Sequence, residues 1–98
     1  MVNAKNFKII KTVIDRHIPK EYKVFVFGSR AKNTNRKYSD IDLGIKGRKK
    51  LDTKKLGMVM ADLEASNLPY KVDVVDFKRI GNSFINKVLS GKILWIRN

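Results

Sequence analysis

The segment Lys23–Phe27 places the strongest constraint on the fold of this chain. It reads Lys-Val-Phe-Val-Phe, a nearly continuous apolar run of β-branched and aromatic residues that ends at Gly28-Ser29. Such a run is typical of a central strand covered on both faces. A strand of this kind needs partners around it, so the segment predicts a sheet with helices packed against it.

Apolar spacing predicts the remaining elements. Helices with apolar residues on one face are expected over 3–17 and 53–65, and a last helix is marked by apolar residues from Phe77 to Leu89. Further strands are expected at 39–45 and 70–75, with a short helix or turn over 30–35 and an added strand at 93–96. The order α-β-α-β-α-β-α predicts one α+β domain over 1–98 with a small sheet.

Composition limits the class of protein. With 98 residues the chain is long enough for one modest core, and it has no cysteine for disulfides or thiolate metal sites. No apolar run is long enough to span a membrane, and no signal-peptide pattern opens the chain, so a cytoplasmic protein is expected. The net charge of +13 favours polyanionic partners such as nucleotides or nucleic acid.

Three aspartates lie in the predicted strands, where acidic residues are normally depleted. Asp40 and Asp42 project to one face because side chains alternate along a strand. Asp73, in the next predicted strand, can reach the same face, whereas Asp76 falls past the predicted strand end and is a second choice. Converging carboxylates are hard oxygen ligands, so they predict a Mg²⁺ site suited to phosphoryl or nucleotidyl transfer.

The turn after the first strand supplies a phosphate site. Gly28 lets a phosphate approach the backbone closely, and Ser29 can donate its hydroxyl. Arg30 and Lys32 follow and can neutralise phosphate charge. Gly28, Ser29, Arg30 and Lys32 are therefore the expected nucleotide-binding residues.

Taken together, Gly28-Ser29 followed after ten residues by Asp40-Ile41-Asp42 resembles the motif of the DNA polymerase β-like nucleotidyltransferases. Length and element order are similar to the smallest branch, the minimal nucleotidyltransferases (MNT), over almost the whole chain. Asp73 matches the third carboxylate of the family. The chain departs from the common Gly-Ser-x-Ala-Arg-Gly pattern at Lys32-Asn33.

The resemblance implies the nucleotidyltransferase fold, with a small mixed sheet. It implies a catalytic triad of Asp40, Asp42 and Asp73 that holds two Mg²⁺ ions and uses ATP as substrate. MNT proteins typically act as antitoxins of HEPN-domain toxins, so the implied acceptor of AMP is a tyrosine of such a partner.

Two other functions stay open at this stage, and so does a small-molecule acceptor for the same transfer. The same fold could neutralise its partner by contact alone, without catalysis. Alternatively, the segment Lys46–Lys55, with six basic residues and one acid, could direct the domain to nucleic acid. Aromatic residues for base stacking are not interleaved with these cations, which weakens the second alternative.

Overall fold

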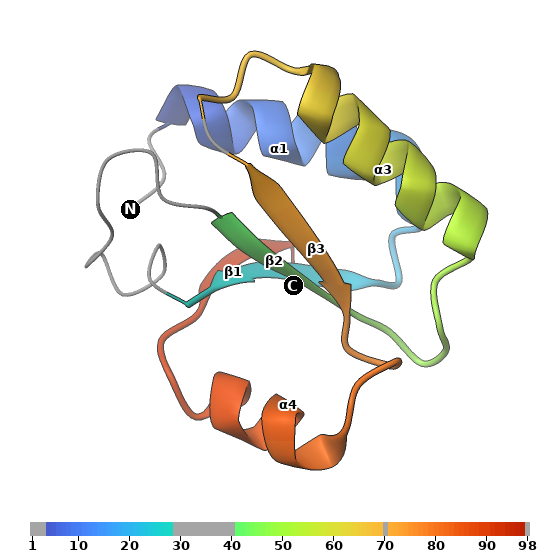
Figure 1. The fold of residues 1–98 in the computed structure, drawn as a ribbon, viewed down its shortest axis with the longest axis vertical. Coiled ribbons are helices and arrows are strands. Elements are labelled where there is room, and N and C mark those ends of the chain that lie inside the picture. The colour runs from blue at the N-terminus through green and yellow to red at the C-terminus, as the bar shows by residue number, and fades with distance from the viewer. Residues whose placement is uncertain (1–3, 29–40, 70, 98) are drawn as a thin grey trace.

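The computed structural model describes residues 4–28, 41–69 and 71–97. Within these ranges the chain forms three helices and four strands (Figure 1). In chain order they are α1 (Ala4–His17), β1 (Lys23–Phe27), β2 (Ile41–Lys46), α3 (Thr53–Ala65), β3 (Val72–Asp76), α4 (Asn82–Leu89) and β4 (Leu94–Arg97).

The four strands form one mixed sheet in the order β3-β2-β1-β4. β1 pairs antiparallel with both β2 and β4, whereas β2 and β3 run parallel. β1 is therefore an interior strand, as its apolar sequence predicts, and every residue from Val24 to Phe27 is buried. The predicted α+β class with a small mixed sheet is confirmed.

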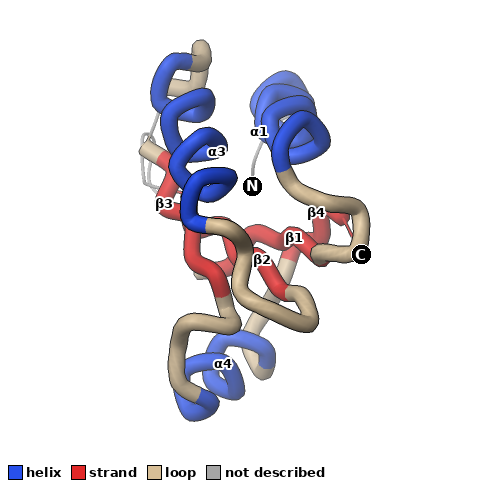
Figure 2. Tube along the Cα trace, turned by 90° about the vertical axis from the view of Figure 1, so that its right-hand side faces the viewer, coloured by secondary structure: helices blue, strands red, loops and turns tan. Residues whose placement is uncertain are grey.

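Helices cover both faces of the sheet, which gives the domain three layers (Figure 2). α1 and α3 pack on one face, over a core that includes Ile10, Ile41 and Leu43. α4 covers the other face, over the aromatic side chains of Phe25 and Phe77. These faces follow from the alternation of side chains along each strand.

Most predicted boundaries agree with the structure to within two residues. The strand Lys23–Phe27 and the helix Thr53–Ala65 agree at both ends. Asp52 is the N-cap of α3, because its carboxylate accepts the N–H of Lys54 at 3.1 Å. The predicted turn or helix at 30–35 lies outside the described residues.

Two predictions near the third strand were wrong. β3 extends to Asp76, so this aspartate lies in the strand and not beyond it. The last helix begins only at Asn82, so Phe77 and Ile80 precede it. Phe77 is instead buried against the ring of Phe25, 5.0 Å away between centroids, which explains its apolar character without a helix.

Candidate functional site

The parallel pairing of β2 with β3 brings two of the predicted carboxylates together. Asp42 and Asp73 are register partners across the two strands. Neighbouring strands lie about 5 Å apart, and paired residues point to the same face. That face is the one that carries Phe25 and Phe27, opposite the face covered by α1 and α3.

Gly28 adjoins this carboxylate pair. Its predecessor Phe27 is the register partner of Asp42, and Gly28 has a φ of +77°, a conformation that L side chains rarely adopt. A Cβ built on Gly28 would lie 2.6 Å from Oδ2 of Asp42. Only glycine therefore lets the turn approach the carboxylate this closely, which places the backbone of Gly28 beside the acidic site.

Solvent reaches the two carboxylates to different extents. Asp42 is half-buried, and the side chain of Asp73, on the end strand of the sheet, is 46% exposed. The ammonium of Lys71 lies 4.0 Å from Oδ1 of Asp73, but both groups are so exposed that this ion pair is weak. An oxygen ligand set of this kind, open on one side, fits Mg²⁺ that must also accept substrate oxygens.

The other predicted site residues, Ser29, Arg30, Lys32 and Asp40, lie outside the described residues. Within the described ranges, no three acidic, histidine or cysteine side chains converge as metal ligands. The structure therefore brings together Asp42, Asp73 and Gly28.

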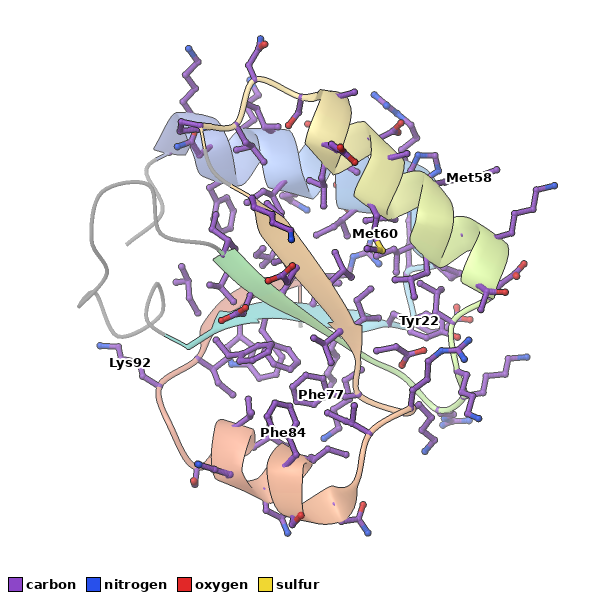
Figure 3. The ribbon with its side chains drawn as sticks, in the orientation of Figure 1. Tyr22, Met58, Met60, Phe77, Phe84 and Lys92 are labelled. Atoms are coloured by element: carbon purple, nitrogen blue, oxygen red, sulfur yellow. The ribbon has the colours of Figure 1, made fainter. Side chains whose placement is uncertain are left out.

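A hollow of about 250 Å³ opens beside Gly28, and sequence reasoning did not identify it as part of the site. Phe84 and Val88 of α4 line it together with Lys87 and Lys92, and the side chain of Phe84 is 43% exposed. Phe84 and Lys92 are labelled in Figure 3, on the α4 side of the sheet. The helical spacing of Phe84 and Val88 is that of ordinary core residues, so only the fold reveals their position beside the glycine.

Asp76, the second-choice carboxylate, has a structural role. Its side chain is fully buried, and its carboxylate accepts the N–H groups of Leu51 at 2.8 Å and Lys78 at 3.0 Å. Arg79 completes the set with its Nε 3.3 Å from Oδ2 of Asp76. The carboxylate is thus committed to holding a loop, which removes it from the candidate site.

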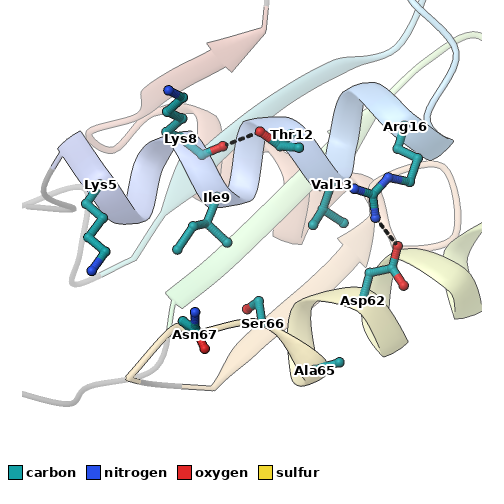
Figure 4. A pocket seen from close by; sticks show the side chains of 10 residues that line it. All are labelled: Lys5, Lys8, Ile9, Thr12, Val13, Arg16, Asp62, Ala65, Ser66 and Asn67. Carbon is teal, nitrogen blue, oxygen red and sulfur yellow. Dashed lines mark hydrogen bonds and ion pairs between the residues drawn. The ribbon is translucent and has the colours of Figure 1, made fainter.

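A larger hollow, about 630 Å³, lies between α1 and α3 (Figure 4). Lys5, Lys8 and Arg16 line it, and Arg16 donates to Asp62 at 3.1 Å. Nε2 of His17 lies 2.6 Å from the same carboxylate oxygen of Asp62. This hollow is separated from Asp42 by the sheet, so its size does not make it the catalytic site.

None of the helices in the described part of the chain is both long and apolar enough to cross a membrane.

The sequence is similar to those of known nucleotidyltransferases. The family model described as polymerase beta, nucleotidyltransferase matches residues 8–98. The chain is 32% identical over 83 residues to a probable protein adenylyltransferase MntA of Haemophilus influenzae, which covers 85% of this chain and 72% of that relative. It is 35% identical over 89 residues to the protein adenylyltransferase MntA of Shewanella oneidensis, which covers 90% of this chain and 63% of that relative.

Solved structures share the fold. A toxin–antitoxin crystal structure with AMP-PNP contains a chain that superposes with a TM-score of 0.75 at 26% identity, over 93% of this chain and 72% of that one. A tri-AMPylated HEPN toxin of Shewanella oneidensis in complex with its MNT antitoxin gives a TM-score of 0.69 at 24% identity, over 94% of this chain and 69% of that one.

Proposed function

The chain belongs to the polymerase beta nucleotidyltransferase family, and we propose that it transfers AMP from ATP to a tyrosine of a HEPN-domain toxin, for which it is the antitoxin. The observation that carries the proposal is the pairing of Asp42 with Asp73 beside Gly28. The adenylyltransferase names of relatives at 32% and 35% identity support the choice of AMP as the transferred group.

Each of these residues has a distinct task. Asp42 and Asp73, with Asp40 from the same motif, would hold two Mg²⁺ ions, which when bound lower the pKa of the acceptor hydroxyl and neutralise the leaving pyrophosphate. Gly28 and Ser29 would hold the triphosphate, because a bare glycine backbone admits a phosphate that a side chain would exclude.

The transfer itself is a single substitution at phosphorus. The tyrosine oxygen forms a bond to the α-phosphorus of ATP, the bond from that phosphorus to the bridging oxygen breaks, and pyrophosphate leaves. The hydroxyl proton must pass to a nearby base. Asp73 is the described carboxylate best placed to take it, because its exposed position on the end strand is accessible to a side chain of a partner protein.

The test is to incubate the protein with Mg²⁺, ATP labelled at the α-phosphate and a candidate HEPN-domain toxin. Mass spectrometry should show AMP on a tyrosine of the HEPN protein. Asp42→Asn should abolish the transfer, whereas Asp52→Asn is the matched control, because asparagine caps a helix as well as aspartate does. Undiminished transfer by Asp42→Asn would refute the assigned role.

Neutralisation by contact alone makes a different prediction. In that case the double variant Asp40→Asn, Asp42→Asn would still protect cells from the toxin, although no AMP was transferred. The exposed side chains of Phe84 and Trp95 are the observation that favours such a contact surface.

A further inference from the structure

The connection between β2 and α3 carries a dense group of cations that the proposed reaction does not use. We call this group the basic ridge; its members are Lys46, Arg48, Lys49, Lys50, Lys54 and Lys55. All six residues are exposed, and none takes part in an ion pair within the described ranges. Closely spaced cations repel one another, and Asp52, the one acid over 46–55, offsets only part of their charge, so a bound anion would stabilise the ridge.

The ridge lies away from the candidate site. β2 begins beside Asp42 and ends at Lys46, and Figure 1 shows the following connection at the far end of the sheet from the start of β2. β3 runs parallel to β2, with Asp73 near its start and Asp76 at its end, beside the ridge. A nucleotide bound at Asp42 and Asp73 is therefore not the anion that the ridge meets.

The backbone of the ridge is fixed on one side by β3. Leu51, at its centre, is 1% exposed. The N–H of Leu51 donates to Asp76 at 2.8 Å, and the C=O of Leu51 accepts Nη2 of Arg79 at 2.8 Å. Asp76 and Arg79 also pair with each other, so both backbone polar groups of Leu51 are held by one ion pair, whose carboxylate is buried and whose guanidinium is partly exposed.

Tyr22 fixes the other side. Its hydroxyl donates to the C=O of Lys50 at 3.3 Å, and its ring lies so close to Gly47 that a Cβ there would be 2.5 Å from the ring carbons. Tyr22 is itself buried (Figure 3 labels it beside this loop), and that burial raises the pKa of its hydroxyl, which stays a donor at neutral pH. The cations therefore project from a pre-formed backbone, which lowers the entropy cost of binding.

The side chains of the ridge favour one class of polyanion. Leu51 is the only large apolar residue over 46–55 and it is buried, so this loop offers no apolar centre of the kind that protein interfaces have. The neighbouring ring of Tyr22 is buried, so the exposed side chains are lysines and an arginine, which suit the sequence-independent contacts made to phosphate groups. We propose that the basic ridge binds the phosphodiester backbone of a nucleic acid.

The experiment measures fluorescence anisotropy of labelled single-stranded RNA, its duplex and the equivalent DNA, titrated with the full chain at several salt concentrations. Affinity should fall steeply with salt. Lys49→Gln, Lys50→Gln should weaken binding and make the salt dependence for single strands shallower by about 1.4 in log–log slope, or about 0.7 for each lost phosphate contact. The three probes decide between RNA and DNA.

Lys5→Gln, Lys8→Gln is the matched control, because it removes two exposed lysines from α1 and changes the net charge equally. Equal losses in the two double variants would overturn the proposal, since the binding would then follow net charge alone. It would also be overturned if the ridge variant bound nucleic acid normally but lost affinity for the toxin. In that outcome the ridge would be a protein-docking surface.

Discussion

Gly28→Ala is the most direct test of the site geometry. At a φ of +77°, alanine carries the penalty of the left-handed conformation, about 1–2 kcal/mol for an L residue. The new Cβ would also lie 2.6 Å from Oδ2 of Asp42, where ordinary contact begins at 3.4 Å. To reach ordinary contact, the carboxylate or the turn must therefore move by about 0.8 Å.

Two measurements should register these effects separately. Thermal unfolding should show the strain as a decrease in Tm of roughly 5–15 °C, because 1 kcal/mol corresponds to about 4–8 °C in a domain of this size. The rate of AMP transfer, measured at a temperature where the variant is folded, should fall by on the order of 100-fold, since a displacement near 1 Å has that effect in active sites.

Gly57→Ala is the matched control. Gly57 is inside α3, and a Cβ added there meets nothing within 4 Å. Alanine should raise stability by up to about 1 kcal/mol through its higher helix propensity, with transfer unchanged. If Gly28→Ala instead had the Tm and the AMP-transfer rate of the unmodified protein, the assignment of Gly28 and Asp42 to one site would be wrong.

Three further predictions concern stability. Asp76→Asn should lower the free energy of unfolding by roughly 2–3 kcal/mol in a denaturant titration, because a buried charged acceptor is lost. Gly44→Ala should cost about 1–3 kcal/mol by the same assay, since its Cβ would lie 2.4 Å from the ring of Phe25. The hydrogen bond from Arg97 holds the pKa of Asp15 below its ordinary value. This interaction should stabilise the fold above about pH 4, and that stability should be lost as the pH falls through the folded pKa. Asp15→Asn should reduce the loss, which is measured as the change of Tm with pH.

A specific outcome would contradict each of these predictions. An Asp76→Asn variant that was stable but inactive would return Asp76 to the catalytic group. Gly81→Ala, where a Cβ meets only open space, is the control for Gly44, and equal effects would contradict the packing argument. An identical acid transition with and without the carboxylate of Asp15 would show that its bond to Arg97 contributes nothing to stability.

Local pattern predicted most of the secondary structure. The apolar run at 23–27 and the apolar spacing at 53–65 determine elements whose bounds agree at both ends, because their own side chains form the core. The region after β3 was less predictable. Phe77 has the spacing of a helical residue but packs as part of an aromatic cluster, and sequence cannot distinguish the two.

The residues of the candidate site can be named from the sequence, but the geometry of the described ones cannot. Alternation alone puts Asp73 on one face of its strand, yet only the parallel register sets it beside Asp42. Similarly, the sequence ranks Asp73 above Asp76 through a predicted strand end that is wrong, because both residues lie on one strand, three residues apart. Burial does separate them, because the first faces solvent and the second is enclosed with Arg79.

Because β3 lies at the end of the sheet, Asp73 has a second role. The strand reads Val-Asp-Val-Val-Asp, and one of its two acids is buried, which leaves Asp73 as the charge within a valine-rich segment. Charged residues on end strands oppose edge-to-edge association of identical molecules. Replacing Asp73 with asparagine would therefore favour self-association as well as removing a proposed metal ligand. Asp73→Glu keeps the charge and moves the carboxylate, so it separates loss of catalysis from loss of solubility.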